Sequence, residues 1–120
     1  MKRIFIVDDH RFMRETLAAF IDAETDMAAC GAAGSTAEAL ACLPLDADLV
    51  LVDLRLGKEN GLDLVRRLRT ERPHLKTVVL SAGRADVYRT ASLEAGAQAY
   101  VEKTNVDMML DVLRSVDAQA

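Results

Sequence analysis

The sequence predicts an α/β fold with a five-stranded parallel sheet, and three observations support this prediction. Short apolar runs rich in β-branched residues alternate with longer stretches of helical period, which is typical of strand–helix units around a parallel sheet. Several of these runs are continuous, as in strands that are buried on both faces. A chain of 120 residues can bury about two-thirds of its surface, so it needs no metal or disulfide to fold. We therefore treat residues 1–120 as one domain.

Five short segments are the predicted strands. Residues 3–7, 49–52 and 77–80 carry the continuous apolar runs. Residues 27–32 and 99–101 have weaker patterns, and we predict strands there because each lies between two stretches of helical period.

Five helices are predicted between and after these strands. In residues 11–24, apolar side chains spaced by three or four, among them Met13 and Leu17, share one helical face. Ser35 begins the second helix, because its hydroxyl can cap the free amides while Glu38 reaches back to complete a capping box. The other three helices are predicted at residues 62–71, at residues 84–95 and from residue 106 onward.

Charge and composition exclude several classes of function. Asp and Glu outnumber Lys and Arg by 19 to 15, so this domain alone lacks the basic surface of a nucleic-acid-binding protein. The apolar run behind Lys2 and Arg3 is too short for a signal peptide or a membrane span. We expect a cytoplasmic protein in which Cys30 and Cys42 are reduced, buried thiols.

Polar side chains follow the predicted strands at the points where the strands end. Asp8 and Asp9 follow the first strand, Asp53 the third and Ser81 the fourth, and Lys103 lies just past the fifth. In an open parallel sheet, ligands bind outside the carboxyl ends of the strands, near the point where strand order reverses. If the strand order is 2-1-3-4-5, three carboxylates, one hydroxyl and one ammonium converge on one cleft.

Such a cluster predicts phosphate chemistry with a hard cation. Three carboxylates at close range repel one another, so a cation must neutralise them, and oxygen ligands favour Mg²⁺ over zinc or copper. A Mg²⁺ ion can complete its shell with a phosphate oxygen, to which Lys103 would add a second positive charge and Ser81 a hydrogen bond. One carboxylate is then the nucleophile that forms an aspartyl phosphate, a transfer governed mainly by positioning and charge stabilisation.

This arrangement resembles the receiver domains of the response regulators in two-component signalling, over essentially all 120 residues. Each matching motif is weak alone, but their order along the chain and their places at the strand ends make the match specific. The motifs are Asp8-Asp9, Asp53, Ser81-Ala82, Tyr100 and Lys103, together with Gly61 and the Gly96-Ala97 pair.

The resemblance implies a flavodoxin-like, doubly wound (βα)₅ domain with a five-stranded parallel sheet of order 2-1-3-4-5. The resemblance implies a phosphoacceptor signalling domain rather than an enzyme. A histidine kinase or phosphotransfer protein delivers a phosphoryl group to Asp53. Self-dephosphorylation, which removes this group again, is the one reaction that the domain itself would catalyse. The resemblance also implies that Mg²⁺ is ligated by Asp9, Asp53 and the backbone carbonyl of Arg55, while Asp8 acts mainly through water.

The resemblance also assigns the residues that respond to phosphorylation. Lys103 pairs with the phosphoryl oxygens, and Ser81 is the switch hydroxyl that moves toward the phosphoryl group. Tyr100 changes its rotamer into the vacated space and reshapes the face formed by the fourth helix, the fifth strand and the fifth helix. We expect homodimerisation or partner binding through that face.

Several functions stay open beside this one. The segments 52–56 and 99–103 are similar to those of helix-turn-helix transcriptional regulators, so we expect the N-terminal receiver of a DNA-binding regulator. The alternatives are a stand-alone receiver or phosphorelay intermediate, and a receiver-like module without phosphate or Mg²⁺. A phosphohydrolase of the haloacid-dehalogenase kind also uses an aspartyl nucleophile, but it needs a second Asp where this chain has Arg55. We interpret His10 as polar surface at a helix start, because a hard-oxygen site has little need of imidazole.

Overall fold

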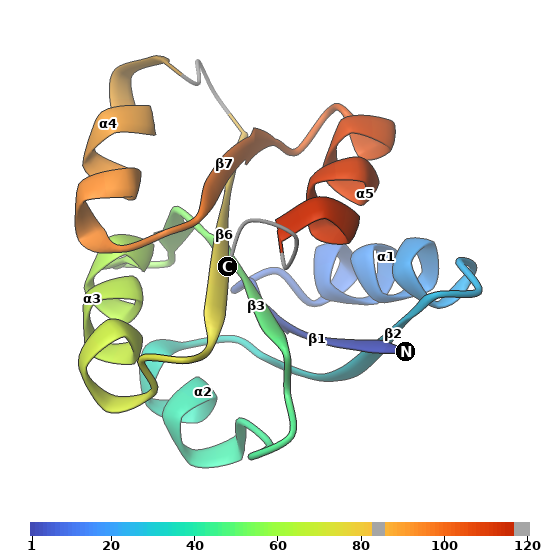
Figure 1. Cartoon of the computed structure of the whole chain (residues 1–120). Coiled ribbons are helices and arrows are strands. Elements are labelled where there is room, and N and C mark those ends of the chain that lie inside the picture. Colours follow the sequence, from blue (N-terminus) through green and yellow to red (C-terminus); the bar gives the residue numbers. More distant parts are fainter. Residues whose placement is uncertain (83–85, 117–120) are drawn as a thin grey trace.

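A computed structural model of the chain describes residues 1–82 and 86–116. Its main sheet has five parallel strands in the order β2-β1-β3-β6-β7, which is the predicted 2-1-3-4-5 order (Figure 1). The flavodoxin-like fold is therefore confirmed. The strands are β1 (Lys2–Val7), β2 (Met27–Ala33), β3 (Leu49–Asp53), β6 (Lys76–Ser81) and β7 (Ala99–Glu102).

Helices cover both faces of this sheet. Figure 1 shows α1 and α5 on one side, and α2, α3 and α4 on the other. Residues 84 and 85, with which the fourth helix was predicted to begin, lie outside the described residues. No helix in the described part of the chain is long and apolar enough to cross a bilayer. The helices are α1 (Arg11–Asp22), α2 (Thr36–Cys42), α3 (Gly61–Glu71), α4 (Asp86–Ala95) and α5 (Val106–Ser115).

The alternation of side chains along the strands divides the interior into two cores. In β1, Ile4 and Ile6 face the core beneath α1 and α5, whereas Phe5 and Val7 face the core beneath the other three helices. All four side chains are at most 1% exposed. This two-sided burial explains why the strand sequences are continuous apolar runs rather than alternating ones.

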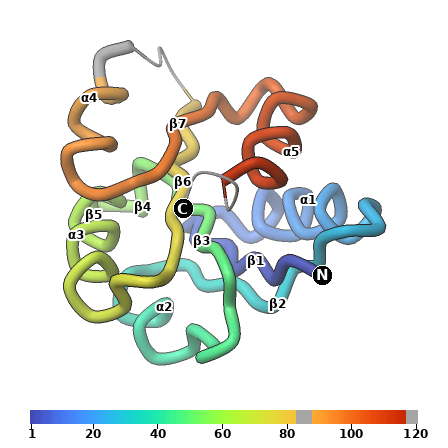
Figure 2. The backbone as a smooth tube through the Cα atoms, in the orientation of Figure 1, coloured from blue at the N-terminus to red at the C-terminus, as the bar shows by residue number. Residues whose placement is uncertain are grey.

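A small hairpin that the sequence did not indicate follows β3. Its strands, β4 (Arg55–Leu56) and β5 (Glu59–Asn60), pair antiparallel around a turn formed by Gly57 and Lys58, next to α3 in Figure 2. Gly57 has a φ of 62°, a conformation that glycine adopts without the steric cost that a side chain brings. The hairpin therefore shapes the segment that begins two residues after Asp53.

The expectation of two buried thiols is wrong for Cys42, which is exposed, and Cys30 is half-buried. In α2 the buried side chain is Ala39, and Leu43, four residues later, takes the inward position. Cys42 is thereby turned toward solvent.

Candidate functional site

Four of the predicted site residues gather at the carboxyl edge of the sheet. Asp8 follows β1, Asp53 ends β3, Ser81 ends β6, and Lys103 lies one residue beyond β7. Asp9 lies beside Asp8, so the cleft predicted from the strand ends exists in the fold. A cavity of about 470 Å³ opens over the cluster, and its lining includes Asp9, Asp53, Ser81 and Lys103.

The ammonium of Lys103 joins two buried carboxylates. Its Nζ lies 2.8 Å from Asp53 Oδ2 and 2.9 Å from Asp8 Oδ2. The side chain of Asp8 has no exposed surface, and those of Asp53 and Lys103 are 6% and 11% exposed. Such buried charges must be paired, and here one cation pairs with two anions.

Burial and charge shift two pKa values at this site. Burial raises the pKa of Asp53, and the hydrogen bond from Lys103 offsets only part of that rise. Burial works against the charged form of Lys103, but the carboxylates of Asp53 and Asp8 outweigh burial and raise the pKa of the ammonium. Lys103 therefore stays protonated at neutral pH.

Backbone contacts hold the two main acids in place. Asp8 N donates to Ala33 O at 3.0 Å, and Arg14 Nη1 donates to Asp8 O at 2.8 Å. Behind Asp53, the start of α3 approaches so closely that a Cβ on Gly61 would lie 2.1 Å from Asp53 O. Only a residue without a side chain allows this approach, which sets the position of the loop after β3.

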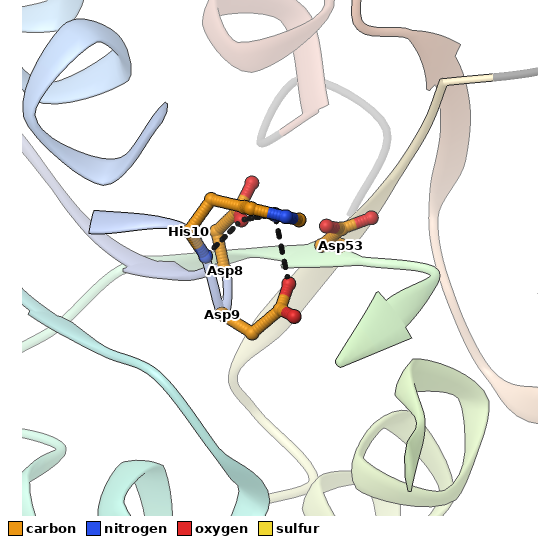
Figure 3. Close-up of side chains that lie close together, drawn as sticks. All are labelled: Asp8, Asp9, His10 and Asp53. Atoms are coloured by element: carbon orange, nitrogen blue, oxygen red, sulfur yellow. Dashed lines mark hydrogen bonds and ion pairs between the residues drawn. The ribbon is translucent and has the colours of Figure 1, made fainter. Parts of the chain in front are cut away.

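A second group of contacts lies around Asp9 and His10 (Figure 3). Ligand atoms of Asp8, Asp9, His10 and Asp53 all lie within 4.8 Å of one another. His10 Nδ1 is 3.1 Å from Asp9 Oδ1 and 3.5 Å from Asp8 Oδ1. His10 lies at the start of α1 with a side chain that is 74% exposed, and one of its ring nitrogens also faces the acids. Its place next to the acidic pair was the available sequence signal.

The donor set fits a hard cation such as Mg²⁺. Lys103 pairs with two of the three carboxylates, which leaves an excess of negative charge at the cluster, and carboxylate oxygens are ligands that Mg²⁺ prefers. Asp9 Oδ1 is a buried atom that accepts no hydrogen bond from the described residues. Arg55 N donates to Asp53 Oδ1 at 3.2 Å, so the Arg55 peptide lies at the rim of the cluster. A bound cation would satisfy the unpaired oxygen.

The two predicted switch residues lie in different places. Ser81 is buried and lines the cavity over the acids. Tyr100 is also buried, but it lines a groove with residues of α4 and α5, and the guanidinium of Arg89 lies 5.5 Å from its ring centre. Tyr100 Oη has no hydrogen-bond partner among the described residues. Tyr88 of α4, which the sequence did not single out, lines the acidic cavity.

An open parallel sheet with this strand order, covered on both faces and carrying acids at its carboxyl edge, defines a CheY-like α/β domain. The chain belongs to the response regulator receiver domain family, whose model matches residues 4–114.

Individual relatives agree with this assignment. The chain is 36% identical, over 104 residues, to the DNA-binding transcriptional activator DevR/DosR of Mycobacterium tuberculosis, covering 86% of this chain and 48% of that protein. The CheY-like receiver domain structure from Methanospirillum hungatei matches with a TM-score of 0.83 and 27% identity, covering 99% of this chain and 96% of that one. A Burkholderia pseudomallei response regulator, solved with a phosphorylated aspartic acid, calcium ion and citrate, matches with a TM-score of 0.80 and 25% identity, covering 99% and 72%.

The curated relatives are longer than this chain. The chain spans about half the length of the curated relatives it matches, which include transcriptional regulators from Bacillus subtilis and response regulators from Staphylococcus aureus. It is a receiver domain similar to those of DNA-binding transcriptional regulators.

Proposed function

We propose that this domain is a signalling switch that accepts one phosphoryl group on Asp53 from a histidine kinase or a histidine phosphotransfer protein. The single observation that carries the proposal is the double contact of Lys103, whose ammonium lies within 3 Å of both Asp8 and Asp53 at the floor of an open cavity. This arrangement leaves one carboxylate accessible to a donor and holds a positive charge beside it.

In the transfer, an oxygen of Asp53 forms a bond to phosphorus while the bond from phosphorus to the donor's histidine nitrogen breaks. That nitrogen keeps the bonding electron pair, and the imidazole takes up one proton. The ammonium of Lys103 lies where it can follow the charge onto a phosphoryl oxygen, since it already contacts Asp53 Oδ2 at 2.8 Å. The hydroxyl of Ser81, at the wall of the same cavity, would donate to another phosphoryl oxygen.

Asp9, Asp53 and the backbone carbonyl of Arg55 would hold Mg²⁺, with Asp8 acting mainly through water. When bound, the cation supplies charge neutralisation for the acids and for the incoming phosphoryl group. The Burkholderia regulator named above, solved with a phosphorylated aspartic acid and a calcium ion, supports both the acceptor and the cation. The N–H of Arg55 donates to Asp53 Oδ1 at 3.2 Å, so the Arg55 backbone lies next to the acceptor, which supports this assignment.

Intact mass spectrometry tests the proposal. With Mg²⁺ and acetyl phosphate, the full chain should gain one phosphoryl group, and Asp53→Asn should gain none. Asp63→Asn is the matched control, because Asp63 is an exposed aspartate on α3 that should leave the reaction unchanged. The proposal is wrong if the wild-type chain gains no group or if Asp53→Asn gains as much. Turnover of a phosphomonoester would instead favour the phosphohydrolase alternative.

The output would be read from the face formed by α4, β7 and α5. Leu93 and Met108 are 46% and 52% exposed there, on either side of the groove that Tyr100 lines. Phosphorylation adds a local charge of about −1.5 to −2, and movement of Ser81 and Tyr100 would carry that change to this face. Sedimentation with a phosphoryl mimic should show homodimers, and a mass that stays monomeric would leave binding to another protein as the readout.

Similarity to DNA-binding regulators supports placing this receiver at the N-terminal side of a DNA-binding output domain. The alternative is a stand-alone receiver or a phosphorelay intermediate. The sequence of the gene beyond codon 120 decides between them: a helix-turn-helix domain supports the first, and a stop codon supports the second.

A further inference from the structure

His10 occupies a helix-capping position without acting as a cap. It is the N-cap residue of α1, with an extended backbone, and its side chain makes no capping hydrogen bond. Residues at this position usually offer a side-chain oxygen to the free amides of the first turn. Here the imidazole turns the other way, and Nδ1 faces the oxygens of Asp8 and Asp9 (Figure 3). The imidazole ring therefore does not serve to cap the helix, and its contacts with the acids suggest another role.

The contact between the ring and Asp9 is close, but it is not a hydrogen bond. His10 Nδ1 and Asp9 Oδ1 are 3.1 Å apart, whereas Asp9 Oδ1 remains a buried acceptor with no hydrogen-bond partner among the described residues. The ring nitrogen and the carboxylate oxygen approach each other without the geometry of a hydrogen bond. Two ligands of one metal ion have this relation, because each directs its lone pair at the ion rather than at its neighbour.

The separations match those between ligands of a small divalent ion. With metal–ligand bonds of about 2.1 Å, neighbouring ligands lie about 3.0 Å apart in an octahedral site and about 3.4 Å apart in a tetrahedral one. The distance from His10 Nδ1 to Asp9 Oδ1 is 3.1 Å, whereas Asp8 Oδ1, 3.5 Å from Nδ1, already accepts a hydrogen bond from His10 N at 2.9 Å. The whole group lies within 4.8 Å, slightly more than the about 4.2 Å between opposite ligands of an octahedron with those bonds. A small contraction would complete the site.

We propose that His10 Nδ1 is a direct ligand of the cation bound at this cluster, so that the site favours a borderline metal of the Co²⁺ or Zn²⁺ type more strongly than its carboxylates alone would. Imidazole nitrogen suits these metals, whereas Mg²⁺ prefers oxygen. The inference rests on the proposed function only in using the same cation site. Its consequence is that the metal occupying the site depends on the identity of residue 10.

Calorimetric titration of the full chain with CoCl₂ and, separately, MgCl₂ tests the proposal, and the visible absorption of bound Co²⁺ reports the donor set. His10→Ala should weaken Co²⁺ binding at least about tenfold and alter its spectrum, because loss of a supporting group alone typically costs 10–100-fold. Mg²⁺ affinity should fall by less than about twofold, since Mg²⁺ gains little from nitrogen. His10→Asn, a better helix cap that offers oxygen, guards against loss of folding and should behave like His10→Ala.

His74→Ala, at an exposed loop histidine, is the matched control and should bind both metals as the wild type does. Equal Co²⁺ affinity and spectra in wild type and both His10 variants would overturn the proposal. Asp9→Asn separates the two claims. If it loses Mg²⁺ while the His10 variants change nothing, only this inference fails; if the wild-type chain binds neither metal, the cation site of the proposed function fails with it.

Discussion

Replacing Lys103 by Met removes the ammonium that pairs with two buried carboxylates while keeping the length of the side chain. In the wild type, Nζ contacts Asp53 and Asp8 at 2.8 and 2.9 Å, and the Asp8 side chain has no exposed surface. Without this cation, two like charges remain in a buried site with no counter-charge. We expect the free energy of unfolding to fall in the absence of divalent cations.

The size of this loss follows from the burial of the acids. Removing one partner of a buried ion pair costs about 3–5 kcal/mol. Asp53 borders an open cavity that water can enter, so we expect the lower end, about 3 kcal/mol. A domain of this size has a total stability of about 5–15 kcal/mol, so the loss is a large part of it. The chain has no tryptophan, so urea unfolding should be followed by far-UV circular dichroism.

The loss of stability in Lys103→Met should become smaller as the pH falls. Burial raises the pKa of Asp53, and Lys103→Met removes the bond that opposes this rise. A carboxyl whose pKa is raised in the folded state binds its proton more tightly there, so it favours folding at low pH and loses that contribution as the pH rises through the folded pKa. The difference between Lys103→Met and wild type should therefore shrink as the pH falls from neutral.

Lys58→Met, in the exposed turn of the hairpin, is the matched control and should change stability by less than about 0.5 kcal/mol. The reasoning is refuted if Lys103→Met loses no more stability than Lys58→Met at neutral pH.

Three further predictions concern stability in urea or heat. Gly61→Ala should lose about 3 kcal/mol, because its Cβ would lie 2.1 Å from a backbone oxygen. Gly34→Ala should lose less than about 1 kcal/mol, because its Cβ would meet only the side-chain ends of Arg14 and Glu38, and equal losses in the two variants would contradict this expectation. Tyr100→Phe should leave the unphosphorylated domain as stable or about 1 kcal/mol more stable, and a clear loss would reveal a partner for the buried hydroxyl. Mg²⁺ at ten times its Kd should add about 1.4 kcal/mol and raise Tm by about 6 °C, and an unchanged Tm would argue against cation binding.

Most of the fold could be predicted from the sequence, because strands that are buried on both faces appear in it as continuous apolar runs. Continuous apolar runs marked β1, β3 and β6, and the capping box at Ser35 placed α2, where Ser35 Oγ accepts from Glu38 N at 3.2 Å. The hairpin after β3 escaped notice, since its strands have two residues each and no alternating pattern. In β2, the register shifts between Ile4 and Phe5 of its partner β1, and such irregular pairing depends on packing that no local pattern reveals.

The grouping of the candidate site was predictable for the same topological reason. The carboxyl ends of parallel strands meet at one edge, so the residues after each strand had to converge. The direction in which an exposed side chain points, in contrast, does not follow from the topology of the sheet. The preference of a hard cation for oxygen led us to interpret His10 as polar surface, whereas its ring nitrogen lies 3.1 Å from Asp9 Oδ1.

The central claim is that Asp53 alone accepts the phosphoryl group, and the most direct test is to locate the modified residue. After reaction with acetyl phosphate and Mg²⁺, reduction with borohydride converts an aspartyl phosphate to homoserine, which peptide mass spectrometry identifies by position. The account predicts homoserine at position 53 and at no other aspartate, with the signal absent when Mg²⁺ is chelated. Homoserine at Asp8 or Asp9, or none at all in the wild-type chain, would contradict it.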